Sequence, residues 1–497
     1  YHEDIAFSDQ VMGKQNVWQR YSTVAEWIEK FIGTKVDDTE KEADQNEKLK
    51  ILESLTISTG QAEEQDNLVD TFIKTQDYIR LLEPNTLLVI GKKGTGKTAL
   101  FRMLLQEKGN QFIPIKVVAP SKLYGHPLYL DRDGFEHIEK TLKTNRLPWS
   151  TFWQVYILLR LVAEKPGLYS GTLNPPLQAL FQQPSQMGLM DFLERTLTMD
   201  KISFLVQDEL AQLSRGLEVP IFLLFDGLDT GFGSGKDDLQ RRTRAITGLF
   251  ELWYDWDGKF SNIRFKIFLR KDIWDNIMFQ NKSHVWGRDI RIQWDQVNYI
   301  KTIGKQVLRS PLFAEYFREK TKEIPSPDIE EWDSEDVWTL LRLLVGERMK
   351  GGNTTYTRNW IWNRLADGNG DHSPRYLFQL FRVAIDLEKE EFVTEKNPYL
   401  RSLIRPRMLA NALPRVSEEA VNALREEYPE LEKFMNHIKG KMSPLQKQEL
   451  ESFENEIDIA RESGLISVYE RDGGVPMRYA VPDLYLKGLE MTRKGQA

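Results

Sequence analysis

The sequence predicts an α/β protein built on a parallel β-sheet that is flanked by helices, followed by a mainly helical second half. Between residues 61 and 295, short apolar runs of strand length alternate with helical patterns, which is typical of a parallel sheet. From about residue 296 the pattern is helical, with a single hairpin signal near the end. At 497 residues and 41% hydrophobic content, the chain can bury a sizeable core.

Composition excludes several classes of protein. The hydrophobic content rules out a wholly disordered chain, and no apolar run reaches the length of a membrane span. There is no cysteine, which excludes disulfides, thiolate metal sites and cysteine nucleophiles and fits a cytoplasmic protein. The first ten residues do not resemble a signal peptide. The chain begins with Tyr1, which leaves open whether a further segment precedes it.

The net charge of −7 is concentrated in one segment. Between Asp37 and Asp70 there are 11 acidic residues against three lysines, so the rest of the chain is close to neutral. The run DDTEKEADQNEK predicts a solvated linker or an exposed helix, with an acidic contact for a partner as the alternative. No broad basic surface is implied, so the charge does not support nucleic-acid binding.

The strongest motif follows the apolar run Thr86–Ile90. Residues 91–98 read GKKGTGKT and lead into the helical pattern ALFRMLL, so a G-x-x-x-x-G-K-[ST] phosphate loop stands between a strand and a helix. Its glycines allow the loop to turn backbone N–H groups toward phosphates, and the helix N-terminus adds positive charge. Lys97 would reach the β- and γ-phosphates, and Thr98 would coordinate Mg²⁺. The predicted nucleotide-binding residues here are Gly91, Gly94, Thr95, Gly96, Lys97, Thr98 and Ala99.

An acidic turn follows the most apolar strand. The run Pro220–Phe225 predicts a buried central strand, and Asp226 stands at its carboxyl end. A carboxylate at this position beside a phosphate loop is suited to binding Mg²⁺, so Asp226 joins Thr98 as a candidate metal ligand. Asp229 would orient or activate the attacking water, or simply cap the turn. Gly227 occupies the position that is glutamate in many vigorous ATPases, which favours slow turnover.

Three arginines compete to contact the γ-phosphate. Phe265–Leu269 predicts a third strand, whose end places Arg270 at the same sheet edge, although an ordinary ion-paired arginine is the alternative. Arg288 and Arg291 are candidates for an arginine finger that acts on a neighbouring subunit. We assign Lys97, Asp226, Asp229 and Arg270 to catalysis.

Other patterns carry less chemistry. The second glycine-rich run, Gly233–Lys236, lacks the first glycine and the final hydroxyl of the motif, so it predicts a flexible loop. The six histidines form no close pair, which makes a zinc site unexpected. The tryptophans, including Trp294, are assigned to the core rather than to a binding surface.

These motifs, with Ser373–Leu377 further along, resemble in their order the bacterial STAND/AAA+-like P-loop ATPases, which are related to origin-recognition ATPases and often occur in phage-defence loci. The run GQAEEQDNLVDTFIKTQDYIRLLE resembles that family's lead-in near the adenine. In such families the arginine of an SPR-type turn reports on the nucleotide from the start of a lid helix, and Arg375 matches it. The local sequence predicts that Ser373 is the N-cap of this helix and that Pro374 is its first residue.

The resemblance also implies a C-terminal winged-helix domain. Helix Glu451–Ser463, strand Leu465–Glu470, a turn and strand Val475–Val481 would form its last helix and its wing. Residues 401–497 carry 15 basic against 16 acidic side chains, which favours packing or partner recognition over DNA binding. Residues 1–31 more weakly resemble the end of a ParA/MinD-like ATPase.

We therefore predict the tail of an upstream domain (1–36), an acidic linker (37–60), a P-loop ATPase core (61–295), a helical lid (296–400) and a winged-helix domain (401–497). The resemblance implies a cytoplasmic ATP- and Mg²⁺-dependent switch with slow turnover in bacterial defence against phage or plasmids. Its expected partner is a second copy of the chain or an effector protein, with no membrane. Two alternatives stay open: a DNA-binding initiator or transposition-type ATPase, and a nucleotide-bound scaffold without turnover.

Overall fold

The computed structural model describes residues 38–60, 68–107, 111–118, 122–123, 126–168, 173–181, 188–233, 235–322, 324–349, 355–394, 401–472 and 474–494. The segment 1–36, assigned above to an upstream domain, lies outside these residues, as does part of the lead-in run at 61–67. No helix among the described residues combines the length and the apolar character needed to cross a membrane.

The first large unit is an α/β core. Its elements are α4 (Leu68–Thr71), α5 (Gln76–Leu82), β1 (Leu88–Gly91), α6 (Lys97–Gln106), β2 (Ile113–Val118), β3 (Lys122–Leu123), β4 (His126–Pro127), α7 (Arg132–Thr144), α8 (Trp149–Glu164), η2 (Pro166–Leu168), α9 (Pro175–Phe181), α10 (Leu189–Leu197), α11 (Ile202–Gly216), β5 (Ile221–Phe225), α12 (Lys236–Trp256), β6 (Ile263–Arg270), α13 (Lys271–Asn276), η4 (Lys282–Val285) and β7 (Asp289–Arg291).

In the described part of the core, five strands form a parallel sheet in the order β2-β5-β6-β1-β7. Alternate residues of each strand pack on opposite faces. On β5, Leu223 joins the cluster under α8, α11 and α12, whereas Phe222 and Leu224 pack with α5 and α6. The α/β class and the parallel sheet predicted from the sequence are thus confirmed.

The parallel sheet brings three functional segments together. Because parallel strands end at the same edge, the loop after β1, Asp226 after β5 and Arg270 at the end of β6 meet there. The predicted strands lie within about two residues of the observed ones. The short edge strand β7, which carries Arg291, was not predicted as a strand.

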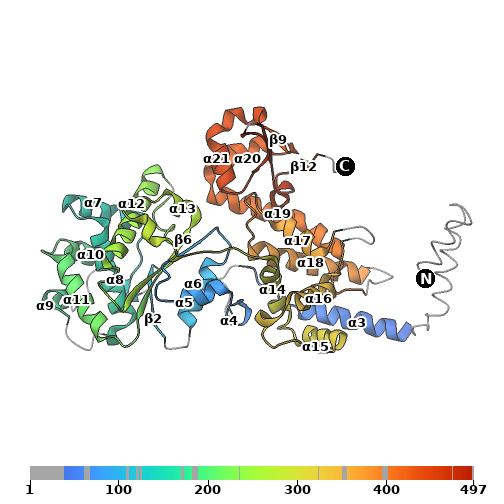
Figure 1. The fold of residues 1–497 in the computed structure, drawn as a ribbon, viewed down its shortest axis with the longest axis horizontal. Coiled ribbons are helices and arrows are strands. Elements are labelled where there is room, and N and C mark those ends of the chain that lie inside the picture. The colour runs from blue at the N-terminus through green and yellow to red at the C-terminus, as the bar shows by residue number, and fades with distance from the viewer. Residues whose placement is uncertain are drawn as a thin grey trace, which may run out of the picture.

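The second half begins with a helical region from α14 to α18, which corresponds to the predicted lid and keeps that name below (Figure 1). Its elements are α14 (Gln296–Val307), α15 (Pro311–Thr321), η5 (Ile329–Glu331), α16 (Ser334–Val345), α17 (Thr357–Leu365) and α18 (Pro374–Thr394). The C-terminal region contains α19 (Pro406–Glu427), η6 (Pro429–Leu431), α20 (Glu432–Ile438), β8 (Met442–Ser443), β9 (Leu445–Gln446), η7 (Lys447–Phe453), α21 (Glu454–Glu462), β10 (Ser467–Asp472), β11 (Val475–Ala480), α22 (Asp483–Leu486) and β12 (Thr492–Arg493).

The lid and the C-terminal region share one hydrophobic core, which α18 and α19 join. The hairpin expected from the sequence is present as β10 and β11, and β9 pairs with β11 to complete a small sheet. The assignment of this region as a winged helix, and the domain boundaries, stay predictions. In Figure 1 the red C-terminal region stands above the junction between the core and the lid.

Of the two predictions for the acidic segment, a solvated linker or an exposed helix, the structure has a helix, α3 (Asp38–Ser54), but this helix packs along the lid and buries part of its surface (Figure 1). Ile51 and Leu52 are buried in the lid core. Lys48 is only 4% exposed and donates to Glu388 of α18 at 2.8 Å, and Glu388 also accepts from Arg405. A buried acid between two cations offsets the cost of removing their charges from water.

A buried lysine on the central strand β6 is hydrogen-bonded to the segment that precedes β1. Lys266 on β6 is fully buried, its Nζ donates to the carbonyls of Glu83 (2.5 Å) and Thr86 (2.7 Å), and it lies 4.4 Å from the ring centre of Phe222. Burial lowers the pKa of Lys266 to about 7. The neutral amine still has two N–H groups for the two carbonyls.

This pKa gives a testable pH dependence. Since the folded-state pKa of Lys266 lies below its unfolded value, the unfolded chain binds more protons above pH 7, so stability rises with pH through that window. We expect the free energy of unfolding of the parent, relative to Lys266→Met, to rise by about 1 kcal/mol per pH unit between pH 7 and 9. Guanidinium unfolding of both proteins at several pH values measures this. Parallel pH curves would contradict it.

Candidate nucleotide site

A cavity of about 930 Å³ opens at the carboxyl edge of the sheet. Its walls come from the loop between β1 and α6, the ends of β5 and β6, α12, the segment before α14, the start of α18 and the end of α19. Its volume is near the upper end of the usual range for small-molecule sites. All eleven residues assigned above to catalysis, metal or nucleotide binding line it, except Gly91, which lies directly before the loop.

The phosphate loop has the backbone that its glycines allow. Gly94 and Gly96 have φ values of 80° and 111°, in the region that favours glycine. Gly96 directly precedes α6, so the loop delivers Lys97 and Thr98 to the first turn of that helix. The Nζ of Lys97 donates to the carbonyls of Gly91 (2.8 Å) and Lys92 (2.7 Å), and burial lowers its pKa. The ammonium therefore lies against the loop, as a phosphate-binding cation should.

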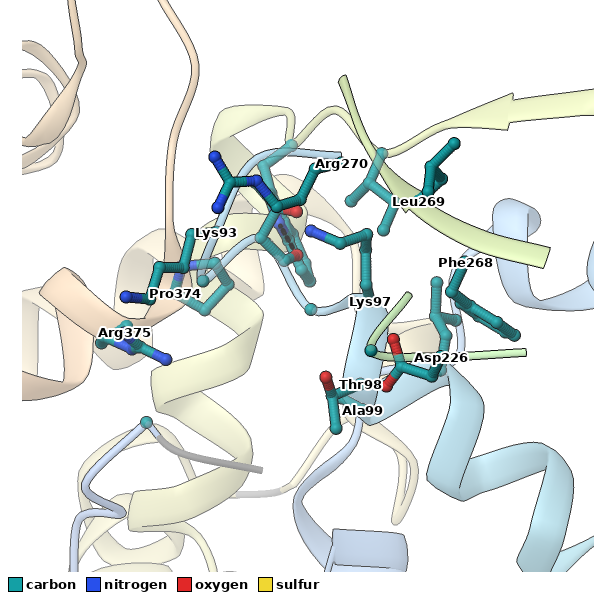
Figure 2. Close-up of a pocket in the computed structure, with 18 of the residues that line it drawn as sticks. Lys93, Lys97, Thr98, Ala99, Asp226, Phe268, Leu269, Arg270, Pro374 and Arg375 are labelled. Carbon is teal, nitrogen blue, oxygen red and sulfur yellow. Dashed lines mark hydrogen bonds between the residues drawn. The ribbon is translucent and has the colours of Figure 1, made fainter. Parts of the chain in front are cut away.

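Asp226 and Thr98 face each other, as Figure 2 shows. The Thr98 hydroxyl bonds to the Asp226 carboxylate, and both residues line the cavity. Burial raises the pKa of Asp226 to about 6, against the hydrogen bond from Thr98 and the charge of Lys97, which lower it. A hydroxyl beside a buried carboxylate is a donor set of hard oxygen atoms that fits Mg²⁺.

Arg270 is held by carboxylates on three sides. It pairs with Asp272 at 2.9 Å, with Glu427 of α19 at 2.8 Å and with Asp229 at 3.6 Å. Burial alone would lower its pKa, but the carboxylates of Glu427 and Asp272 outweigh burial and raise it above the ordinary value. The Arg270 guanidinium also lies over the aromatic ring of Tyr428, which lines the cavity as well.

The start of α18 in the lid contacts the phosphate loop. Arg375 lines the cavity, and its Nε is buried without a hydrogen-bond partner. The hydroxyl of Ser373, expected to cap α18, instead donates to the carbonyl of Gly94 at 2.8 Å. A side chain at Gly94 would place Cβ 2.6 Å from the Ser373 Oγ, so only glycine permits this approach. Figure 2 shows Pro374 and Arg375 beside Lys93 of the loop.

Further contacts tie the loop to the second half of the chain. Lys92 pairs with Asp367 (2.5 Å) and Asp371 (3.0 Å) between α17 and α18, and Lys93 lies 3.8 Å from Glu426 of α19. Sequence reasoning missed these pairs, because nothing in the motif requires a partner for its variable lysines.

Trp294 was assigned to the core, but it belongs to the site. It is half-buried, lines the cavity and donates from Nε1 to the carbonyl of Thr95 at 3.1 Å. The one feature of the sequence that could have placed Trp294 at the site is its position next to a strand end.

Two predicted arginines do not reach this cavity. Arg288 pairs with Asp257 at 2.7 Å, near the start of β1, and Arg291 is exposed on the edge strand β7 beside Asp289. Neither lines the cavity of its own chain, so an action on a neighbouring subunit stays a prediction. Gly235 of the second glycine-rich run is the N-cap residue of α12, and Lys236 is exposed. Within the described ranges, no group of three or more His, Asp or Glu side chains could hold a metal ion.

The parallel sheet, the phosphate loop after β1 and the acid after β5 define a P-loop nucleotide-binding module. The family model described as ORC-CDC6-like matches residues 57–107, the segment that carries this loop.

Among solved structures, the chain is similar to Cdc6p from Pyrobaculum aerophilum, with 12% identity over 81% of this chain and 85% of that one and a TM-score of 0.29. Because that TM-score is low, the fold assignment rests on this chain's own strand order and motifs. No curated protein matches.

Lys97 gives the first test of the site. We expect Lys97→Met to lower the affinity for Mg²⁺-ATP by about 10–100-fold, because a hydrogen bond between charged partners contributes about 1.5–3 kcal/mol. Lys236→Met is a matched control, since Lys236 lies in the second glycine-rich run, outside the cavity. Calorimetric titration measures both. Equal affinities for the two variants would remove the phosphate loop from nucleotide binding.

Proposed function

We propose that the protein is an ATP-binding, slowly hydrolysing molecular switch. One observation carries the proposal: the phosphate end of the cavity is built jointly by the core and by the second half of the chain. Lys92, Lys93 and Arg270 of the core each pair with carboxylates from the lid or α19. A ligand at this end would therefore contact both halves.

ATP would bind with its phosphates on residues 91–99, and Thr98 and Asp226 would hold Mg²⁺. The metal, when bound, would neutralise part of the phosphate charge and so assist transfer of the γ-phosphoryl group to water. Lys97 lies close enough to Asp226 and Asp229 to balance their charge. Arg375 would contact the nucleotide from the lid side.

Slow turnover fits the carboxylates that are present. Gly227 follows Asp226, so the turn lacks a glutamate that could activate water there. Asp229 lines the cavity but shares the guanidinium of Arg270 with Asp272 and Glu427. An arginine that pairs with a carboxylate competes with water for its oxygen atoms.

The ion pairs supply a switching device. The phosphates of ATP are anions that compete with Glu426 and Glu427 for Lys93 and Arg270. Each contact made to a phosphate weakens one made to α19, so ATP favours a state in which the C-terminal region is less tightly held. A ligand shifts such an equilibrium by its difference in affinity for the two states.

The role of this switch in the cell is the furthest step. The resemblance to STAND/AAA+-like ATPases supports the proposal that it gates an effector, or its own assembly, in defence against phage or plasmids. The ORC-CDC6-like match favours a second candidate, a DNA-engaging initiator. The near-neutral C-terminal region opposes that candidate, and duplex binding with a steep salt dependence would establish it.

Glu427 tests the switch. We expect Glu427→Gln to raise the affinity for Mg²⁺-ATP by about tenfold and to loosen α19, because Arg270 loses one of its competing carboxylates while it keeps Asp272. ATP titration, ATP turnover and limited proteolysis of the C-terminal region are the measurements. Glu418→Gln, at an exposed position of α19, is the matched control.

Three outcomes decide between the functions. Turnover that requires Lys97, with proteolysis enhanced by ATP and by Glu427→Gln, supports the switch. Tight binding of ATP with no turnover and no change in proteolysis supports a static scaffold. No ATP binding by the parent protein would overturn both.

A further inference from the structure

A second arginine faces the phosphate end of the cavity, and it was not recognised from the sequence. Arg242 lies on α12, two turns after the loop that follows Asp226, and it lines the cavity together with Asp229 and Arg270. Its side chain is half-buried. Its neighbours on the helix, Arg241 and Arg244, instead reach Glu139 of α7, away from the cavity.

Arg242 differs from the other cations of the site in its bonding. Lys97 is bonded to loop carbonyls, and Arg270 is surrounded by three carboxylates. Arg242, by contrast, forms no ion pair or side-chain hydrogen bond to any described residue, and its Nε is buried without a partner. A half-buried guanidinium that makes no hydrogen bond to protein has lost part of its hydration, and no protein hydrogen bond offsets that loss.

The position of Arg242 assigns it to the terminal phosphate. It feels the charges of Asp272, Arg270 and Asp229, and the last two also act on Lys97. Lys97 marks the place of the β- and γ-phosphates. Arg242 and Lys97 therefore line the same cavity and share Asp229 and Arg270, which follow β5 and end β6, as charged neighbours.

Charge supports the same assignment. Four carboxylates, Asp226, Asp229, Asp272 and Glu427, surround this end of the cavity. Arg270 is already committed to three of them, so the cation predicted from the sequence is the less available one. Burial has the largest effect on Arg242 and lowers its pKa, and the charges of Asp272 and Asp229, which raise the pKa, do not offset it.

We propose that Arg242 binds the γ-phosphate of ATP within its own chain and so makes the site distinguish ATP from ADP. This inference rests on the proposed function, because it requires that the cavity binds nucleoside phosphates. It adds a group that distinguishes the two nucleotides to the arginines that the sequence offered as contacts of the γ-phosphate.

The test compares two nucleotides in four proteins. Affinities for Mg²⁺-ADP and for the non-hydrolysable triphosphate Mg²⁺-AMP-PNP are measured by calorimetry on the parent, Arg242→Ala, Arg242→Lys and Arg244→Ala. We expect Arg242→Ala to weaken triphosphate binding by roughly 10–100-fold and diphosphate binding by less than about threefold. Arg242→Lys should recover part of the loss, because it keeps the charge but not the fork of donors. Arg244→Ala should match the parent.

Each outcome is decisive for one claim. An unchanged ratio of triphosphate to diphosphate affinity in Arg242→Ala overturns the assignment while the nucleotide-binding proposal stands. Equal losses for both nucleotides, with a lowered unfolding temperature, would assign Arg242 a structural role and also overturn it. If Arg242→Ala does not fold, the ratio in Arg242→Lys decides. Failure of the parent to bind either nucleotide removes the proposed function itself.

Discussion

The neutralisation of the phosphate loop is the interaction on which the rest of the structure depends. A loop with three lysines and a helix N-terminus concentrates positive charge, and without phosphate that charge needs other partners. The protein supplies them from two sources: the loop's own carbonyls hold Lys97, and acids of the lid and of α19 hold Lys92 and Lys93. The second half of the chain is thereby held against the core at the place where a nucleotide would act.

The same contact explains the demands on backbone geometry. Gly94 must lack a side chain for two reasons, its positive φ and the approach of Ser373. The phosphate loop is thus shaped by its contact with Ser373 at the start of α18. Trp294 adds a third constraint, since its indole N–H is bonded to the carbonyl of Thr95.

The sequence predicts the parts of this site that depend on neighbouring residues. Strand β5 is a continuous apolar run because both faces of a parallel sheet are covered, β6 is apolar at most of its positions, and the phosphate loop has fixed spacing. The partners of Arg270 and Lys92, and the position of Arg242 in the cavity wall, could not be predicted, because they depend on tertiary contacts between distant segments. For Lys48 the sequence was misleading. Its place in an acidic run indicated a solvated helix, whereas the structure buries its side chain against Glu388.

The anchoring of α3 has a mechanical consequence. Lys48 joins α3 to α18, Ser54 bonds to Ser310 at the start of α15, and the amide of Ser58 donates to Gln306 of α14. These contacts fasten the helix to the lid rather than to the sheet. Any rotation of the lid about the cavity would therefore carry α3 with it and displace this helix relative to the core. Helix α3 and the candidate nucleotide cavity are in this sense mechanically coupled through the lid.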